Sequence, residues 1–397
     1  MILALLATAV FQHSAPRVEL VESWPRGTPL DHADLRDARD VWVQLFDAAQ
    51  SSIDLAHFYA SDDPAAAGSS PLEPVIAALE RAAARGVRVR GIFDAKFHKT
   101  YPDTIARIAR APGAETRLLD LGPVTGGVLH AKYFVVDGRR VFLGSQNLDW
   151  RALEHIQELG ALVEAEPVAR ALLEVFELDW RLAAGDQASR TPSQAADGFP
   201  LRLGEGADAS TVTPVYSPAS LCPDPRLWDL PRIVALIDGA KTSVRLQLLT
   251  YKTSARDGSY FEVLENALRR AAARGARVEL LLADWCKRKG TIEGLQSLEP
   301  LPNVAVKLVT IPPDEGGFVP FARVIHAKYL VVDGRAAWIG TSNWEKSYFD
   351  ASRNVGLVVE GGALPRRLDA YFATGWNGPY AAAVDPCAVY APPRIGD

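Results

Sequence analysis

The chain has 397 residues, of which 48% are hydrophobic and 23% are charged, and 43 Lys and Arg face 48 Asp and Glu for a formal net charge of −5. This is the composition of an ordinary globular protein with room for two domains. A negative net charge excludes a protein that coats nucleic acid through bulk positive charge, so a nucleic-acid substrate would need a local positive site.

The N-terminus begins with an apolar run, Met1–Val10, followed by polar residues and Ala15. Its length suits the core of a secretory signal, so residues 1–15 are a candidate signal segment and the protein is expected to be secreted or periplasmic. No Lys or Arg precedes the run. The alternative is a buried N-terminal element or a start codon placed too late, which would leave the protein cytoplasmic. No apolar run reaches the ~20 residues of a membrane span, so no transmembrane segment is expected.

The elements predicted for the first half alternate between helix and strand. In chain order they are a helix over 41–49, a strand over 52–56, a long Ala-rich helix ending at Gly86, a strand over 87–93, two strands joined at Asp137 and Gly138, a strand over 159–163 and a helix ending at Trp180. Gly is the residue type that ends helices in a left-handed conformation, and Asp-Gly is typical of tight hairpin turns. Such alternation predicts an α/β sheet.

The second half repeats this order, because similar segments recur along the chain. The matching pairs are Ser52–Ala56 with Ser243–Gln247, Arg81–Val89 with Arg270–Val278, and His130–Gly138 with His326–Gly334. The order is kept and only the loops differ in length. The chain is therefore predicted to be a duplication of one domain and not a solenoid.

The predicted fold class is α/β, with two α/β/α sandwich domains related by a pseudo-twofold axis, each a mixed sheet flanked by helices. The halves are placed at residues 16–185 and 219–397. Between them, residues 186–218 are rich in Gly, Ser, Ala, Asp and Pro and are predicted to be a linker. The active site is expected at the interface of the halves.

Chemistry-bearing residues recur at equivalent positions of the two halves. They are His130, Lys132, Asp137 and Asn147 in the first half, and His326, Lys328, Asp333 and Asn343 in the second. Two such sets at equivalent points of a duplication are not an accident. Asp137 and Asp333 each precede a Gly in a tight turn, so they are assigned a structural role.

The spacing of the remaining residues makes chemical sense for a phosphodiester substrate. Residues two apart on a strand share a face, so His130 and Lys132 are expected to point the same way, as are His326 and Lys328. When the halves pack together, the two sets converge on one pocket. Ammonium and amide groups there would hold the non-bridging oxygens, while two imidazoles share nucleophilic and acid-base work.

The two motifs resemble those of the phospholipase D superfamily, and the resemblance covers nearly the whole chain, from Val18 to Cys387. Shorter segments are similar to one branch, the animal lysosomal phospholipase-D-like 5′ exonucleases and their relatives. These segments are Leu20–Pro25, Gly127–His130, Asn147–Arg151, Glu158–Gly160, Pro313–Glu315, Pro320–Val324, Gly340–Trp344 and Trp376–Tyr380.

The resemblance implies a two-step displacement that uses no metal and no cofactor. One His attacks phosphorus to form a phosphohistidine while the other protonates the departing oxygen, and the second His then activates water or an alcohol. We expect His130 to be the nucleophile and His326 the acid and base, and the nearly symmetric motifs leave the reverse open. The pair should titrate as a coupled unit with a bell-shaped profile on the acid side of neutral.

The superfamily often has a carboxylate that orients a catalytic imidazole, and Glu158 occupies that position in the first half. The matching residue of the second half is Asn354, so Asp350 is expected to be the substitute acid. The alternative for these acids is a helix-surface position for Glu158 and a cap role for Asp350.

The cysteines number three, too few for a disulfide scaffold, and they lack zinc-ligand spacing. The residues alone leave two readings open: one bridge between Cys286 and Cys387 with Cys222 free, or three independent buried thiols. In the branch that the chain resembles, a Cys at the position of Cys286 pairs with one near the C-terminus. The resemblance therefore implies a Cys286–Cys387 disulfide.

Aromatic residues beside each motif bear on the substrate, because nucleobases stack on such rings at ~1–3 kcal/mol each. Trp150, Trp344, Tyr348 and Phe349 are the candidates, with core packing as the alternative. With the branch resemblance, they favour a single-stranded nucleic acid cut from its 5′ end. The alternative substrate is a phospholipid, acted on by a phospholipase D or a cardiolipin-synthase-like phosphatidyltransferase, with the loop 311–324 as its membrane contact. Two intact motifs argue against a non-enzymatic scaffold, and the sequence leaves a homo-oligomer open.

Overall fold

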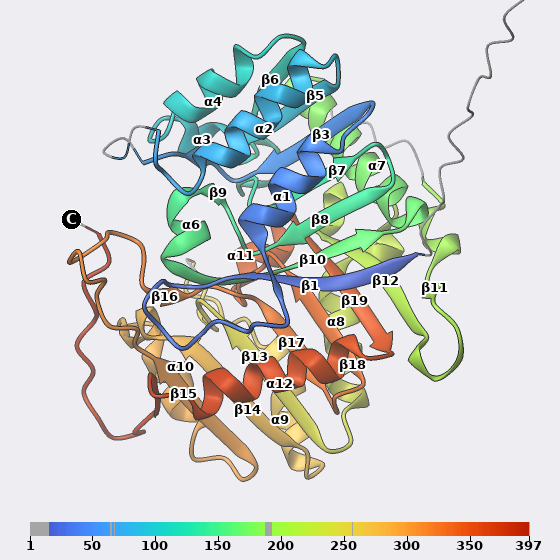
Figure 1. Ribbon diagram of the computed structural model, residues 1–397. Helices are drawn as coiled ribbons and strands as arrows, with labels where there is room; N and C mark the ends of the chain where they lie inside the picture. Colours follow the sequence, from blue (N-terminus) through green and yellow to red (C-terminus); the bar gives the residue numbers. More distant parts are fainter. Residues whose placement is uncertain (1–15, 64–65, 67, 187–192, 256, 397) are drawn as a thin grey trace, which may run out of the picture.

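A computed structural model of the chain describes residues 16–63, 66, 68–186, 193–255 and 257–396 (Figure 1). The candidate signal segment, residues 1–15, lies outside the described residues, so export stays a prediction. The described residues form two large mixed sheets flanked by helices, as the sequence predicts, and one small parallel pair, β4 (Ala60–Ser61) with β9 (Leu148–Asp149). No helix among them is long and apolar enough to cross a membrane.

The first sheet is built mainly by the N-terminal half. Its strands are, in spatial order, β2 (Arg36–Asp37), β1 (Arg17–Ser23), β10 (Ile156–Glu164), β8 (Arg140–Gly144), β7 (Lys132–Val136), β3 (Ser52–His57), β5 (Arg88–Asp94) and β6 (Ala114–Leu119). β3, β5 and β6 are parallel, whereas β7 joins β3 antiparallel. The central strands are buried on both faces, which explains their continuous apolar runs.

The second sheet repeats this order. Its strands are β11 (Leu201–Leu203), β12 (Ser210–Ser217), β19 (Asn354–Gly361), β18 (Ala336–Gly340), β17 (Tyr329–Val332), β13 (Ser243–Leu248), β14 (Arg277–Ala283), β15 (Val304–Val309) and β20 (Ala381–Ala383). From β12 to β15 it matches the first sheet from β1 to β6 strand for strand, with the same parallel and antiparallel pairings. The duplication read from the sequence is thus a duplication of the fold.

The range 186–218, predicted as a linker, contains β11 and β12. β12 is an internal strand that pairs with β19 along its whole length, from Ser210 to Ser217, so this part of the range belongs to the second sheet. The strand is rich in Thr and Val, which favour strands. The Gly, Ser and Pro residues around the strand are typical of loops, and for this reason composition alone predicts a linker here.

Helices cover the outer faces of both sheets and also fill the space between them (Figure 1). They are α1 (Ala38–Asp47), α2 (Glu73–Ala84), α3 (Ala95–His98), α4 (Asp103–Ala109), α5 (Gly122–Thr125), α6 (Trp150–Glu154), α7 (Glu166–Ala183), α8 (Asp229–Gly239), α9 (Val263–Ala273), α10 (Ile292–Leu298), α11 (Lys346–Asp350) and α12 (Leu364–Asn377). α1 and α2 pack on the outer face of the first sheet, and α8 and α9 on that of the second. α7 and α12 pack with the inner faces of both sheets in one central core.

The two halves exchange backbone contacts next to the motifs. A short strand of the second half, β16 (Val324–Ile325), pairs in parallel with Ile156 and Gln157 at the start of β10. The equivalent contact on the other side is a bridge between Leu129 and Arg353. Each motif therefore begins against the last long strand of the opposite half, and this arrangement brings both motifs to one place.

Candidate active site

The two motif histidines are fixed by the backbone of the opposite half. His130 donates its backbone N–H to the carbonyl of Arg353 at 2.9 Å, and His326 donates its own to the carbonyl of Gln157 at 2.8 Å. Both side chains are buried, with 5% and 9% exposed. Neither half can therefore hold its own histidine in place alone.

The imidazole rings are also held across the interface. His326 Nδ1 lies 2.8 Å from both carboxylate oxygens of Glu158, and His130 Nδ1 lies 3.0 Å from Oδ1 of Asn354. Glu158 and Asn354 occupy equivalent positions of β10 and β19. Glu158 thus lies where it can orient a catalytic imidazole, and the imidazole it contacts belongs to the other half.

Hydrogen bonds around Asn354 fix the tautomer of His130. The Asn354 Nδ2 donates to the carbonyls of Tyr348 at 2.8 Å and Ser352 at 3.3 Å, which sets which end of the amide is nitrogen. The amide oxygen accepts from the Thr341 hydroxyl at 2.9 Å. His130 Nδ1 must then be the donor in its contact with that oxygen. In the neutral ring the lone pair consequently resides on Nε2.

Asp350 does not back a catalytic histidine, contrary to the sequence-based expectation. It is the last residue of α11, is exposed, and pairs with Lys346 one turn earlier on the same helix. The chain then turns into β19, whose first residue, Asn354, enters the interface. The neutral Asn354 occupies the position in the second half that is equivalent to the acid Glu158 of the first half.

Two buried lysines complete the centre of the site. Lys132 and Lys328 are 0% and 1% exposed, and each ammonium donates to the carbonyl of its own motif histidine, at 2.6 Å for Lys132 and His130. Burial lowers the pKa of Lys132 well below its ordinary value and that of Lys328 to about 7, and Glu158 opposes both shifts. An anion bound between two ammoniums would restore the charged form of both.

The electrostatics of the histidines show that the two motifs form one site. Burial lowers the pKa of His130 well below 6.5, and the charges of Lys132, Lys328 and His326 lower it further. Burial also lowers the pKa of His326, but the carboxylate of Glu158 opposes this by favouring the imidazolium. His130 is therefore the ring held neutral, and His326 is the ring whose protonated form has a counter-ion.

The two motif asparagines are both buried. Asn343 donates to the Tyr348 hydroxyl at 3.2 Å and accepts from the backbone N–H of Thr250 at 3.4 Å. Asn147 is 6% exposed, and its amide oxygen has no partner among the described residues. A buried amide oxygen without a partner is suited to accept a hydrogen bond from a bound substrate.

The motif aspartates serve the turns, in agreement with the role assigned from the sequence. Asp137 accepts from the backbone N–H groups of Gln50, Ser51 and Ser52 at 2.7–3.2 Å. Asp333 makes the equivalent three bonds to residues 241–243. These bonds tie each hairpin turn to the strand next to it and do not involve the motif histidines.

Of the four aromatic candidates, one lies at the histidines. The Tyr348 ring is 4.9 Å from that of His130 at an interplanar angle of 89° and is partly exposed. Trp344 and Phe349 are 1% and 0% exposed and pack in the apolar core of the second half, so neither is a stacking surface for a substrate. Trp150 is partly exposed but packs against the first-half core and His155.

Phe58 is a neighbour of the site that the sequence analysis did not identify. Its partly exposed ring lies 4.9 Å from that of His130 and 4.9 Å from the Lys132 ammonium. Phe58 directly follows β3, which pairs with β7 so that His57 opposes Lys132. Its place directly after a buried strand is the sequence signal that could have identified it.

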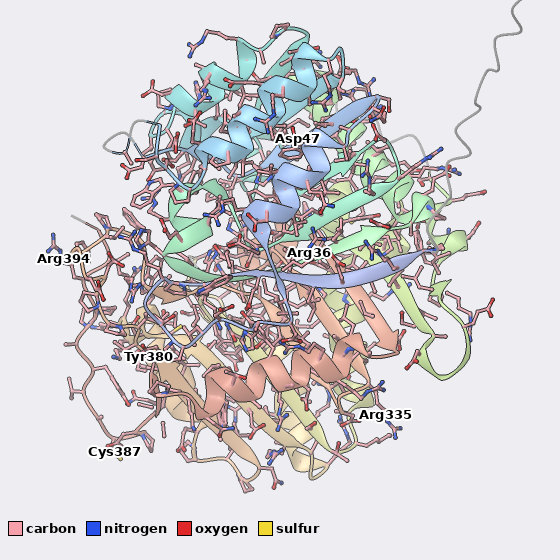
Figure 2. All side chains as sticks on the ribbon, viewed as in Figure 1. Arg36, Asp47, Arg335, Tyr380, Cys387 and Arg394 are labelled. Atoms are coloured by element: carbon pink, nitrogen blue, oxygen red, sulfur yellow. The ribbon has the colours of Figure 1, made fainter. Side chains whose placement is uncertain are left out.

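The disulfide that the resemblance implies is wrong, because all three cysteines are free. Cys286 is fully buried, its thiol donates to the Leu249 carbonyl at 3.4 Å, and burial raises its pKa to about 12. Cys387 is exposed on the C-terminal segment at the periphery of the molecule (Figure 2). One thiol points into the core and the other lies at the surface, so they do not meet.

A buried ion pair supports the segment that holds His130. Arg353 and Asp179 of α7 are both fully buried and bond at 2.8–3.1 Å, and Arg353 also donates to the carbonyls of Ser217 and Leu221. Arg353 directly precedes Asn354. The pair thus couples the interface of the halves to the position of the His130 ring.

Replacing Asp179 by Asn is expected to lower the free energy of unfolding by about 3–5 kcal/mol, because it leaves the buried Arg353 guanidinium without its counter-ion. Urea denaturation followed by tryptophan fluorescence measures the change. Glu166→Gln is the control, since it breaks the exposed ion pair with Arg170 and should cost no more than about 0.5 kcal/mol. A loss below about 1 kcal/mol for Asp179→Asn would contradict this account of the pair.

His57 is expected to make the fold sensitive to acid. It is 1% exposed, burial lowers its pKa from 6.5 to about 3, and the charge of Lys132 contributes. The unfolded chain therefore binds a proton at this residue more readily than the folded one. Stability is lost as pH falls below about 6.5, by about 1.4 kcal/mol per pH unit.

His57→Leu tests this, since Leu248 occupies the equivalent position of the second half. Urea titrations at pH 7, 6 and 5 should show the variant losing less stability than the wild type, with a difference that approaches about 1.4 kcal/mol per unit below pH 6.5. Parallel curves for the two proteins would mean that His57 is protonated in the fold.

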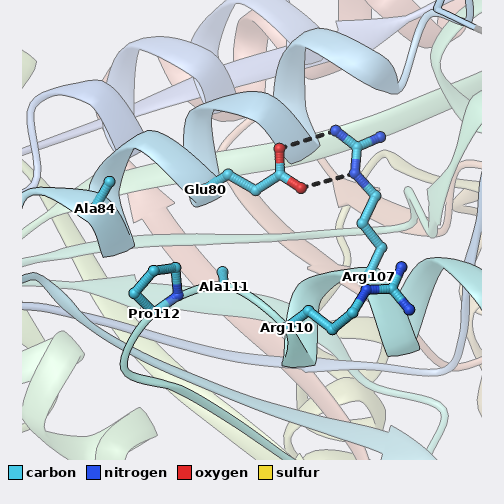
Figure 3. Close-up of a pocket in the computed structure, with 6 residues that line it drawn as sticks. All are labelled: Glu80, Ala84, Arg107, Arg110, Ala111 and Pro112. Atoms are coloured by element: carbon cyan, nitrogen blue, oxygen red, sulfur yellow. Dashed lines mark hydrogen bonds and ion pairs between the residues drawn. The ribbon is translucent and has the colours of Figure 1, made fainter.

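No group of three or more His, Cys, Asp or Glu side chains among the described residues is placed to hold a metal ion. A separate surface pocket lies over α2 and α4 (Figure 3). There Arg107 is already paired with Glu80 at 2.7 Å and with Glu73 at 2.6 Å. The residues that line the pocket contain no motif residue: Glu80, Ala84, Arg107, Arg110, Ala111 and Pro112.

Comparison with known proteins gives matches over most of the chain. A family model described as "Cardiolipin synthase, PLD-like domain" matches twice, over residues 42–180 and 233–376. The 5′-3′ exonuclease PLD3 of Macaca fascicularis is 32% identical over 403 residues, 93% of this chain and 81% of that protein. The 5′-3′ exonuclease PLD4 of Homo sapiens is 32% identical over 414 residues, 96% and 81% of the two chains.

Among solved structures, the phosphatidylserine synthase of Haemophilus influenzae aligns with a TM-score of 0.60 at 13% identity, covering 87% of this chain and 85% of that one. The polyphosphate kinase of Porphyromonas gingivalis aligns with a TM-score of 0.57, also at 13% identity, covering 93% and 49%. At this identity the likeness shows a shared fold alone.

Proposed function

Because the chain belongs to the phospholipase D superfamily and is one of its phosphodiesterases, we propose that it hydrolyses single-stranded nucleic acid from the 5′ end, without a metal ion and through a phosphohistidine intermediate. The observation that carries the mechanism is the pair of imidazoles held through Nδ1, one by an amide and one by a carboxylate. With Nδ1 engaged in each ring, Nε2 of both imidazoles is left to react at one phosphate.

His130 is the nucleophile in this proposal. Its ring is neutral because burial and the two lysines lower its pKa, and its tautomer leaves the lone pair on Nε2. Nε2 attacks phosphorus and forms a P–N bond to the 5′-terminal nucleotide, while the P–O bond to the 5′ oxygen of the remaining strand breaks. The ammoniums of Lys132 and Lys328 stabilise the charge that develops on the non-bridging oxygens.

His326 is the acid and then the base. Its imidazolium, favoured by Glu158, gives the Nε2 proton to the departing oxygen in the first step. The neutral ring then takes a proton from water, which attacks phosphorus as the P–N bond to His130 breaks. Both rings end in their starting states, so the cycle balances without another reactant.

The nucleic-acid substrate is supported by the relatives, which are named 5′-3′ exonucleases and align along most of the chain. The alternative is a phospholipid substrate, with the chain acting as a phospholipase D or a cardiolipin-synthase-like phosphatidyltransferase. The observation that favours it is the loop 311–324, where Phe318 and Phe321 are 40% and 47% exposed. Exposed aromatics of this kind dock at membrane surfaces.

The deciding experiment incubates purified protein in EDTA with a 5′-hydroxyl single-stranded oligonucleotide, and in parallel with phospholipid vesicles. Release of mononucleotides from the oligonucleotide, but not from a circular single strand of the same length, supports the proposal. Headgroup release or phosphatidyl transfer without DNA cleavage favours the lipid enzyme. DNA cleavage that EDTA abolishes would overturn the metal-free mechanism.

A further inference from the structure

A continuous series of aromatic ring contacts begins at His130. The Phe58 ring, next to His130, lies 3.9 Å from that of Phe97. Phe97 is followed by Tyr59 at 6.1 Å with an interplanar angle of 20°, and Tyr59 by Tyr101 at 5.0 Å and 28°. We call Phe58, Tyr59, Phe97 and Tyr101 the aromatic wall. All four residues are partly exposed, so the wall is not a closed core.

The wall is held rigidly next to the reacting groups. Tyr59 donates its hydroxyl to Asp149 at 2.7 Å, and Asp149 is paired with Arg151 at 2.8 Å. The Arg151 guanidinium in turn lies 5.6 Å from the Tyr101 ring. Asp149 follows the motif residue Asn147 by two positions, so the same short segment carries a motif amide and anchors the wall.

The fold itself does not require these rings. The residues of the second half that match Phe58 and Tyr59 are Leu249 and Thr250, and both the sheet order and the strand pairings are nevertheless the same. If the fold required aromatic residues at these positions, both halves would have them. An aromatic wall on one side of a pseudosymmetric phosphate site instead matches a substrate whose two sides differ.

Two lysines lie next to Phe97 in the chain, one on the short helix α3 and one just after it. Lys96 is exposed there, as is Lys99 just after the helix, and neither has an ion pair among the described residues. Ammonium groups beside stacked rings are the combination that holds the backbone and bases of a single strand. In an acidic protein such a local site is what nucleic-acid binding needs.

We propose that the aromatic wall stacks the base of a nucleotide adjoining the scissile phosphate, and so selects single-stranded nucleic acid over phosphodiesters that lack a base. This inference rests on the proposed function. A paired base in a duplex already stacks on its neighbours, whereas a free base presents both faces to a ring such as Phe97. By holding the base, the wall would position the adjoining phosphate without taking part in the reaction at phosphorus.

The test compares two 5′-hydroxyl oligothymidylates of equal length, one normal and one with abasic tetrahydrofuran residues at its first two positions. The wild type is expected to cleave the normal strand about 5- to 150-fold faster, the equivalent of ~1–3 kcal/mol of stacking. Phe97→Ala should slow cleavage of the normal strand by a similar factor and leave the cleavage rate of the abasic strand unchanged. Phe97→Tyr should restore the preference, and Phe321→Ala, at an exposed aromatic of the loop 311–324, should not affect it.

A spectroscopic readout follows stacking directly. A strand with 2-aminopurine at its first or second position, bound to the inactive His326→Asn protein, should lose fluorescence, and adding Phe97→Ala should restore it. Three results would overturn base stacking on the wall without affecting the proposed exonuclease activity. They are equal cleavage rates of the two strands by the wild type, an equal loss of rate on both strands for Phe97→Ala, and 2-aminopurine fluorescence that is not quenched on binding. A wild type that cleaves neither strand but acts on phospholipid vesicles would instead overturn the proposed function.

Discussion

His326→Ala is expected to release one equivalent of p-nitrophenolate from thymidine 3′-(p-nitrophenyl phosphate) in a burst and then to stop, whereas His130→Ala releases none. The leaving group needs no proton, so the phosphohistidine can form on His130 without the acid. Without His326, water is then not activated and the intermediate persists. Stopped-flow absorbance measures the burst, and acid-labile phosphate on the protein identifies the adduct.

On DNA, whose departing oxygen needs a proton, both substitutions are expected to be severe. His130→Ala should lower kcat by at least ~10⁴-fold and His326→Ala by ~10²–10⁴-fold. Asp350→Asn is the control, since that exposed acid pairs with Lys346 and should retain wild-type rates on both substrates. A burst from His130→Ala with none from His326→Ala would reverse the two roles.

Glu158→Gln and Asn354→Asp are expected to shift the pH profile of kcat/KM in opposite directions. Activity requires a protonated His326, so it falls as pH rises through the pKa of that ring. Glu158 raises this pKa against the effect of burial, and its removal should move the alkaline limb to lower pH, with a loss of ~10²–10⁴-fold near neutrality. Activity also requires a neutral His130, whose low pKa places the acid limb well below 6.5.

Asn354→Asp would put a carboxylate 3.0 Å from His130 and raise the pKa of that ring, so the acid limb should move to higher pH. Because the two rings interact, the midpoints of the two limbs are pKa values of the pair. Only the direction in which each limb moves is assigned to a single residue. Thermal melts at each pH separate these shifts from loss of folding. Shifts in the same direction for the two variants would contradict the assignment of acid and nucleophile.

Local patterns in the sequence were sufficient to predict much of the architecture. Strand periodicity and the turn at Asp137 and Gly138 predict the hairpin of β7 and β8, since both depend on neighbouring residues alone. The repetition of segments predicts that the second sheet copies the first. The linker predicted over residues 186–218 is wrong for β12, because the Thr- and Val-rich run of that strand is short and its neighbours are typical loop residues.

The aromatic candidates show what local sequence patterns do not predict, namely which side chain faces the site. Trp344 and Phe349 follow the second motif as closely as Tyr348 does, yet both are buried and Tyr348 lies at His130. Which side of a short segment faces a site depends on how that segment packs. Phe97 lies far from both motifs in the chain, and the carboxyl ends of neighbouring strands bring it to Phe58.

The sequence by itself determined the duplication, the α/β class and the two His-Lys-Asn sets, because each follows from identities and spacings within a short stretch. Only the tertiary structure decided how the sets are completed. Glu158 serves His326 across 168 residues, and Asn354 serves His130 across 224. Each contact crosses the interface of the halves, where packing of two folded sheets, and not the order of residues, determines which side chains meet.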